Sequence, residues 1–261
     1  MKEKLYQSLI ELTNGRWTSS LLRRFALSPA SKRIIPSFAK QYKINVEEMD
    51  RPLEEYESLH DFFTRKLMEG ARPIDQGQAS IASPVDAVLE DMGSIANDAT
   101  FRVKAKLYSI EEMLGGKSEA ERYLDGQYMV LYLSPSHYHR IHSPVDGTVI
   151  RKQTLGSKSY PVNRYGMTLG KSPLSKNYRE ITEIEYKGGR LALIKVGAMF
   201  VNTIERTHTG DTLLKGEEIG YFSFGSTVVL LFEKGTFKAA PFETPAAVRA
   251  GETLGTCQLR H

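Results

Sequence analysis

The stretch Lys215–Phe232, KGEEIGYFSFGSTVVLLF, places two short strand-like runs on either side of a small polar triplet. The first run, from Ile219 to Phe224, is short and alternates in character. The second, Val228–Phe232, is dense in β-branched and aliphatic residues, which is typical of a buried strand. Between them lies Gly225-Ser226-Thr227. The pattern predicts two strands flanking Gly225-Ser226 inside a β-rich fold.

The dipeptide Gly225-Ser226 has the composition that an N-to-O acyl shift requires. Glycine has no side chain to block the approach to its carbonyl, and the serine hydroxyl follows directly. In such a shift the seryl oxygen attacks the preceding peptide carbonyl. A glycine bulge or a tight bend between strands explains the same dipeptide without chemistry, so this stretch alone leaves both interpretations open.

The composition of the 261-residue chain bounds the fold class. It has 41% hydrophobic and 25% charged residues, which favours one large domain, or one domain with an appendage, around a sizeable core. The single cysteine, Cys257, excludes an intramolecular disulfide and a cysteine-based metal cluster, and a reducing compartment fits. No apolar run approaches the ~18–20 residues that span a bilayer. We expect neither a transmembrane helix nor a secretory signal.

The N-terminal segment, residues 1–43, is strongly basic. It carries nine Lys or Arg residues against two Glu, a net charge of +7; because the whole chain carries +4, the remainder carries −3. A helical face contains Leu5, Leu9 and Leu12 and ends at Asn14-Gly15. A second contains Trp17, Leu21, Leu22 and Phe25, interleaved with arginines. Such helices suit an anionic membrane surface, although packing on the main domain explains them equally. Nucleic acid is disfavoured, because no recognised binding motif accompanies the charge.

The rest of the chain divides near residue 74. Before it, Leu59, Phe62, Phe63 and Leu67 predict a helix that ends near Gly70. After it, short β-rich segments alternate with turn residues, and residues 109–124 predict one short helix. We therefore expect an α+β protein: an N-terminal helical membrane-docking region, 1–73, and a β-rich sandwich or barrel-like catalytic domain, 74–261. Besides the two runs around Gly225-Ser226, the expected strands are Ala87–Glu90, Met129–Leu133, Thr148–Lys152, Arg190–Val196 and Met199–Ile204.

One internal repeat stands out in the β-rich part. Ser83-Pro84-Val85-Asp86 recurs as Ser143-Pro144-Val145-Asp146, each before an expected strand. Lys215–Gly220 adds a further turn before another strand. Such turns are typical of pseudo-symmetric β-sandwich or barrel domains, and each aspartate is readily explained as a turn former.

Three of the six histidines lie within the segment His137–His142. An extended segment would place His137 and His139 on one face, whereas a helix would bring His139 and His142 together. Either arrangement supplies a general acid or base near neutral pH, which a hydroxyl nucleophile such as Ser226 needs. Three histidines could also bind zinc, and surface or satisfied core histidines are the remaining interpretation.

Several blocks of the sequence together resemble the phosphatidylserine decarboxylase family of pyruvoyl enzymes. The resemblance covers nearly the whole chain, in the family's order and spacing. Gly-Ser-Thr alone is a weak signal, whereas the blocks together are highly specific. They are Phe224–Thr227; Leu133–Pro135 with Tyr138–His142; Leu59 and Phe62–Arg65 with Arg72-Pro73; Lys215–Gly220 with Phe222; and Val196–Met199.

The resemblance implies a proenzyme that cuts itself between Gly225 and Ser226 into chains 1–225 and 226–261. Ser226 Oγ would attack the Gly225 carbonyl to form an ester. β-Elimination and hydrolysis would then leave a pyruvoyl group, derived from Ser226, at the start of the second chain. The family's Asp-His-Ser relay maps onto Asp86, His142 and Ser226, with the logic of a serine protease.

The resemblance also implies the second reaction. The pyruvoyl ketone would form a Schiff base with the amine of phosphatidylserine, carbon dioxide would leave, and phosphatidylethanolamine would be released. The family places the return of a proton near His139. Two positions depart from the family pattern: Phe224 stands where many members have Leu, and Ala87 follows Asp86 where Gly is frequent. Since Asp146-Gly147 has that glycine, Asp146 is a rival to Asp86, which we keep because of its place in the chain.

The implied partner is phosphatidylserine in an anionic membrane, bound by a peripheral protein on the cytoplasmic face of the cell membrane. The two chains from one proenzyme are expected to stay associated; a homodimer is left open, and no nucleic acid is expected. Two other functions compete with this one. A barrel-sandwich phosphocarrier or binding module would use His139 and His142, and a zinc hydrolase would use those two with His137.

Overall fold

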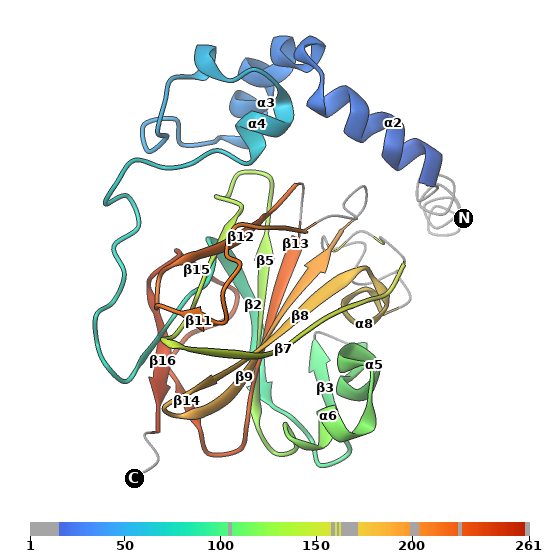
Figure 1. The fold of residues 1–261 in the computed structure, drawn as a ribbon, viewed down its shortest axis with the longest axis vertical. Coiled ribbons are helices and arrows are strands. Elements are labelled where there is room, and N and C mark those ends of the chain that lie inside the picture. The colour runs from blue at the N-terminus through green and yellow to red at the C-terminus, as the bar shows by residue number, and fades with distance from the viewer. Residues whose placement is uncertain are drawn as a thin grey trace.

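The computed structural model describes residues 16–103, 106–157, 160, 162, 172–198, 204–223 and 226–258. Short N-terminal helices lie at one end of the molecule, beside a body built mainly of strands (Figure 1). A connecting segment with little regular structure runs from the last of these helices down one side of the body (Figure 1). The expected α+β class, with sheets dominant, is confirmed.

The N-terminal helices form a small core of their own, which includes Ile35, Tyr56 and Phe62. They are α2 (Arg16–Leu27), η1 (Pro29–Ile34), α3 (Ile35–Tyr42), η2 (Leu53–Glu55) and α4 (Leu59–Phe63). The helix expected before Asn14-Gly15 lies outside the described residues.

Helix α4 is shorter than the pattern from Leu59 to Leu67 predicts, because it ends at Phe63. The residues beyond it serve tertiary contacts instead of helix. Arg65 Nη2 donates to the carbonyls of Ser136 and His137, both at 3.0 Å, and Leu67 forms a β-bridge with Met49. Only the first half of the apolar pattern, Leu59–Phe63, therefore forms helix.

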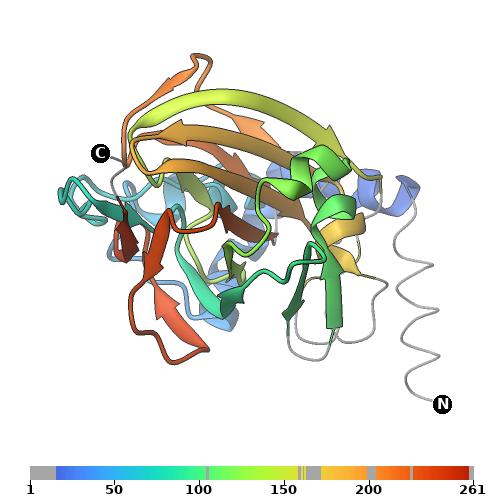
Figure 2. The same cartoon turned by 90° about the horizontal axis from the view of Figure 1, so that it is seen from below.

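The body is centred on an eight-stranded antiparallel sheet with the order β11-β7-β8-β9-β13-β5-β2-β15. Its long strands are strongly curved (Figure 2). Strand β13 lies inside the sheet between β9 and β5, and every one of its residues is buried. The bounds are β11 (Thr212–Leu213), β7 (Gly147–Leu155), β8 (Arg179–Tyr186), β9 (Gly189–Gly197), β13 (Ser226–Phe232), β5 (Gln127–Leu133), β2 (Ala87–Ser94) and β15 (Ala246–Val248).

Two hydrophobic cores cover the two faces of this sheet, which explains the continuous apolar run in β13. Val228, Leu230 and Phe232 belong to one core, and Val229 and Leu231 to the other. The second core includes residues of α5 (Ile110–Leu114), α6 (Lys117–Glu121) and α8 (Pro173–Lys176). The single helix expected over 109–124 is thus two helices, because Gly115 ends α5 in the left-handed conformation at φ 80°.

Smaller sheets complete the body. One has the order β10 (Ile204–Arg206), β12 (Glu218–Phe222), β6 (Arg140–His142), and another the order β1 (Ser80–Ala82), β16 (Thr253–Cys257), β14 (Phe237–Ala239). The third pairs β3 (Thr100–Val103) with β4 (Lys106–Ser109). The strands expected before and after Gly225-Ser226 are β12 and β13, whereas residues 199–203 of another expected strand lie outside the described residues.

The two Ser-Pro-Val-Asp turns are related by approximate two-fold symmetry. Ala82 N donates to Pro144 O at 3.0 Å, and reciprocally His142 N donates to Pro84 O at 2.8 Å. In each turn the serine hydroxyl donates to the valine carbonyl at 2.7 Å. Each turn also contacts an equivalent loop, Lys215-Gly216-Glu217 or Ala250-Gly251-Glu252. The expected pseudo-symmetry is therefore present, and Ala250–Gly255 is the counterpart of Lys215–Gly220, which we did not recognise in the sequence.

Candidate active site

Ser226 is the first residue of β13 and is fully buried. It pairs with Leu133 on β5 and with Gly197 on β9, while Phe224 and Gly225 lie outside the described residues. Its Oγ is buried and has no hydrogen-bond partner among the residues that the structure describes. Such a group costs about 1–3 kcal/mol, so its presence calls for an explanation, and a reactive role is one.

His139 is also fully buried, with its ring 4.0 Å from that of Phe63. Its Nδ1 lies 2.9 Å from the carbonyl of His137, so Nδ1 carries the proton. The buried Nε2 has no partner in the described ranges of the chain. Burial lowers the pKa of His139 to about 3, despite the opposing hydrogen bond to His137. The ring is therefore neutral at pH 7, with an unshared electron pair on Nε2. Phe222 N donates to His139 O at 3.0 Å, which ties His139 to the strand that leads to Ser226.

His142 is held by both ring nitrogens. Its Nδ1 donates to the carbonyl of Gly216 at 2.8 Å, and its Nε2 accepts from the hydroxyl of Tyr138 at 3.1 Å. Burial lowers the pKa of His142, and the Gly216 carbonyl and the charge of Asp86 act in the opposite direction. In this structure neither ring nitrogen hydrogen-bonds to Asp86 or Ser226.

Asp86 and Asp146 have different surroundings. The Asp86 carboxylate is buried and accepts from Arg72 at 2.8 and 2.6 Å and from the backbone N–H of Ala250 at 2.9 Å. Asp146 is exposed and accepts from the backbone N–H of Lys215 at 2.8 Å, as a turn residue does. The structure thus brings Asp86, but not Asp146, into a buried charged environment.

Arg72 and Tyr138 are the neighbours of this group that sequence reasoning left without a role. Arg72 binds Asp86 and also Glu48, whose carboxylate lies 2.9 Å away. Burial opposes its charge, but the hydrogen bonds and the charge of Asp86 raise the pKa of Arg72 above its usual value. Both residues lie inside the family blocks quoted above. Arg72 lies 14 residues from Asp86 and 24 residues from Glu48, so no local pattern could assign it. Tyr138 lies only four residues before His142, and that short spacing was the available signal.

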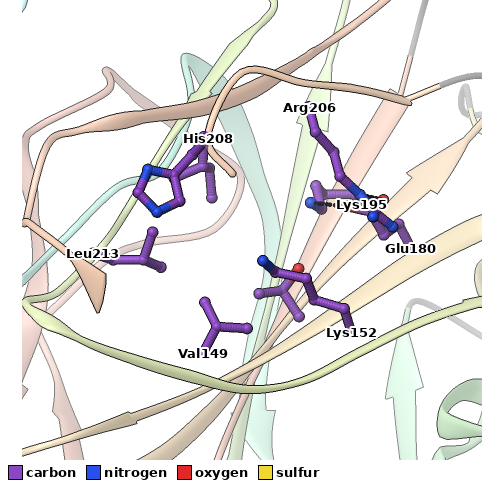
Figure 3. Close-up of a pocket in the computed structure, with 9 residues that line it drawn as sticks. Val149, Lys152, Glu180, Lys195, Arg206, His208 and Leu213 are labelled. Atoms are coloured by element: carbon purple, nitrogen blue, oxygen red, sulfur yellow. Dashed lines mark hydrogen bonds and ion pairs between the residues drawn. The ribbon is translucent and has the colours of Figure 1, made fainter. Parts of the chain in front are cut away.

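A second charged cluster lies on the face of the sheet that Ser226 occupies. Lys195 and Glu180 are buried and ion-paired across β9 and β8, and Arg206 of β10 reaches the same carboxylate (Figure 3). Lys195 pairs with Val228, two residues along β13 from Ser226, so the two side chains share a face. A charged pair inside a strand run was the available signal, and sequence reasoning missed it.

The three histidines have separate hydrogen-bond partners. Among the residues that the structure describes, no group of three or more His, Cys, Asp or Glu side chains is arranged to hold a metal ion. His137 instead bonds through Nδ1 with the backbone N–H of Ser134 at 3.0 Å. The geometry gives the zinc-hydrolase alternative no support.

Comparison with known proteins identifies the family. The phosphatidylserine decarboxylase family model matches residues 59–256. A phosphatidylserine decarboxylase proenzyme of Bacillus thuringiensis (strain Al Hakam) is 56% identical over 262 residues, covering 100% of both chains. Proenzymes of the same description from Bacillus cereus (strain AH187) and Bacillus anthracis (strain CDC 684 / NRRL 3495) show the same identity and coverage. This chain belongs to the phosphatidylserine decarboxylase family.

Proposed function

We propose that the chain is a proenzyme that cuts itself between Gly225 and Ser226 and then decarboxylates phosphatidylserine to phosphatidylethanolamine. The observation that carries the proposal is the buried hydroxyl of Ser226 at the start of β13, which has no partner within the described part of the chain. The full-length relatives of this chain are described as proenzymes. His139 and His142 lie on the segment that pairs with β12, the strand that precedes Ser226.

In the cleavage, Ser226 Oγ loses its proton to a base and attacks the Gly225 carbonyl, so the peptide bond becomes an ester. Removal of the Ser226 α-proton then expels the Gly225 carboxylate and leaves a dehydroalanine residue. Water converts this residue to a pyruvoyl group and releases ammonia. The second chain, 226–261, stays bound because β13 lies between β9 and β5 inside the large sheet.

The surroundings of Ser226 fit a pyruvoyl group in its place. The residue opposite on β9, Gly197, has no side chain, and its carbonyl accepts from Asn177 Nδ2 at 2.8 Å. The group would supply an electron-accepting ketone for decarboxylation. His139 Nε2 has a free electron pair, so it could take a proton from the substrate amine and return it to the substrate carbon after carbon dioxide has left.

We assign the relay of the cleavage to Asp86, His142 and Ser226. His142 N is hydrogen-bonded to Pro84 O, two residues before Asp86, and the charge of Asp86 acts on the pKa of His142. For His142 to act as a base toward Ser226, its Nε2 must leave the Tyr138 hydroxyl. Tyr138 is then the residue that holds the imidazole in the uncut chain.

The N-terminal region, residues 1–73, is proposed to dock the enzyme on the cytoplasmic face of the cell membrane. No helix among the described residues is long and apolar enough to span a bilayer. On α2, however, Leu21, Phe25 and Leu27 are exposed, with Arg23 and Arg24 between them. An amphipathic basic helix of this kind lies in the interface and is attracted to anionic lipid.

The test is the intact mass of the purified protein. Wild-type protein should give two chains split at Gly225/Ser226, with a pyruvoyl group on the second, whereas Ser226→Ala should remain one chain of 29.4 kDa without decarboxylase activity. His142→Ala should accumulate the uncut chain. His139→Ala should still cut itself but turn over phosphatidylserine slowly. Wild-type activity in uncut Ser226→Ala would overturn the proposal.

A further inference from the structure

A cavity of about 270 Å³ lies between the N-terminal helical region and the β-rich body. Lys43 and Arg65 line it from the helical side, and Asp86, Tyr138 and Arg249 line it from the body. Tyr138 is hydrogen-bonded to His142, so the cavity borders the proposed relay. Its volume suits a small polar headgroup and is too small for acyl chains.

The charges of this cavity are unbalanced. Its cations are Lys43, Arg65, Arg72 and Arg249, and its carboxylates are Glu48 and Asp86. Both carboxylates are already taken: Arg72 binds both, and Arg249 lies 3.3 Å from Glu48. Within the part of the chain that the structure describes, Lys43 and Arg65 have no carboxylate partner. The cavity therefore has a net positive charge and attracts an anion.

Arg65 is the unusual member of this set. Its side chain is buried, and Nη2 donates to two backbone carbonyls at 3.0 Å. Nε and Nη1 have no acceptor among the described residues. Burial lowers the pKa of Arg65 to about 10. A buried guanidinium without a counter-charge is destabilising. An anion in the adjacent cavity would offset that cost.

The lining of the pseudo-symmetric counterpart of this cavity contains no arginine among the described residues. The counterpart has a volume of about 480 Å³ and lies beside Asp146, with Leu214 at the position that corresponds to Arg249. Its cations are Lys187, which is exposed, and Lys215, whose Nζ already donates to Gly77 O and Ser80 Oγ. The arginines of the first cavity are therefore not needed to build the shared turn.

We propose that the cavity bounded by Lys43, Arg65 and Arg249 binds the phosphodiester of the phosphatidylserine headgroup. This assignment rests on the proposed function. A short serine linker joins the phosphate to the reacting amine, so the phosphate must bind close to the catalytic group, and this cavity shares Asp86 and Tyr138 with it. Arg249 and Lys43 contact the phosphate at the rim, and Arg65 adds its charge from beneath.

The experiment uses rim substitutions that spare the relay. The variants are Lys43→Asn, chosen because residue 43 has a left-handed backbone at φ 52° that asparagine tolerates, Arg249→Gln, and both together. Lys187→Gln, in the counterpart cavity, is the matched control. Steady-state rates on phosphatidylserine in uncharged detergent micelles exclude attraction to a charged surface. For the double variant we expect KM to rise roughly three- to tenfold with kcat nearly unchanged, and no change for Lys187→Gln.

Calorimetric binding of inorganic phosphate to the self-cleaved protein supplies a readout that needs no turnover. Phosphate should bind the wild type and Lys187→Gln equally, and the double variant several-fold more weakly, with salt reducing the difference. Equal phosphate affinity in the wild type and the double variant, or an unchanged KM in the double variant, would overturn the subsite. Wild-type protein that binds phosphate in this way but does not decarboxylate would support the subsite and refute the proposed function.

Discussion

The two Ser-Pro-Val-Asp turns share a backbone and differ in what surrounds them. In both, a buried serine closes the turn, and the aspartate accepts from a backbone N–H of the equivalent loop. Only Asp86 gains a counter-ion, Arg72, and burial. Only the second turn is preceded by a histidine, because His142 stands where the first has Ala82. Each half thus provides one residue of the proposed relay, across a shared pseudo-two-fold axis.

This difference teaches that the repeat is a structural frame and that the chemistry lies in its departures from symmetry. A turn aspartate needs only a backbone donor, and Asp146 has that. Burying Asp86 with Arg72 is costly unless the pair is well bonded. Both carboxylate oxygens of Asp86 are in fact used. Of the two turn aspartates, Asp86 is therefore the one whose surroundings go beyond what a turn requires.

The largest expected effect comes from replacing each of the two turn aspartates with asparagine, one at a time. Asp86→Asn should slow self-cleavage by roughly 10²- to 10⁴-fold, since the His142 imidazole loses its counter-charge. Asp146→Asn should cleave at nearly the wild-type rate, because an amide oxygen can still accept from Lys215 N. Denaturing gels over a time course measure both rates. If Asp146→Asn cleaved itself more slowly than Asp86→Asn, the relay aspartate would be Asp146 and not Asp86.

The next effect concerns the neutral histidines and pH. Since burial lowers the pKa of His139, the unfolded chain takes up a proton near pH 6.5 and the folded chain does not. The contribution of neutral His139 to the free energy of unfolding is therefore fully present above pH 6.5. It is lost as the pH falls toward the pKa of His139 in the folded chain, about 3. From pH 6.5 to 5 this one residue should cost about 2 kcal/mol of unfolding free energy.

Denaturant unfolding of the uncut Ser226→Ala chain measures this dependence without the complication of two chains. Adding His139→Asn should flatten the dependence of the unfolding free energy on pH between pH 6.5 and 5, whatever its effect on absolute stability. The pKa of His142 is lowered too, but Gly216 and Asp86 oppose the shift, so we expect a smaller change in slope from His142→Asn. An unaltered slope in His139→Asn would mean that this ring is not held neutral by burial.

The sequence predicted the fold class, six of the strands and the repeat, because each of these depends on local periodicity or turn composition. It did not predict the end of α4 at Phe63, since the contacts of Arg65 with Ser136 and His137 are remote in sequence. It missed the bond of Arg72 to Asp86 because 14 residues separate them. It missed the bond of Tyr138 to His142, only four residues apart, because the backbone of residues 134–139 is neither helix nor strand. The assignment of roles to Asp86, His139, His142 and Ser226 came from family resemblance and stays a prediction.

The smallest expected effect is the difference between alanine substitutions at Gly216 and Gly251, the two glycines of the equivalent loops. Gly216 and Gly251 have φ values of 84° and 89°, so alanine strains both by about 1 kcal/mol. An alanine Cβ at 216 would lie 2.6 Å from Ile74 Cγ1, a side-chain atom that can move. At 251 it would lie 2.5 Å from the carbonyl oxygen of Pro73, which follows Arg72 in the chain.

Gly251→Ala should therefore be the more destabilising, by roughly 1–2 kcal/mol beyond Gly216→Ala in denaturant unfolding of the Ser226→Ala chain. In the self-cleaving background, Gly251→Ala should also slow cleavage, because a shift of Pro73 displaces Arg72 from Asp86. Gly216→Ala should slow it less, although Gly216 O holds His142 Nδ1, because the yielding Ile74 side chain spares the backbone. Equal cleavage rates in the two variants would show that the position of Arg72 does not control the relay.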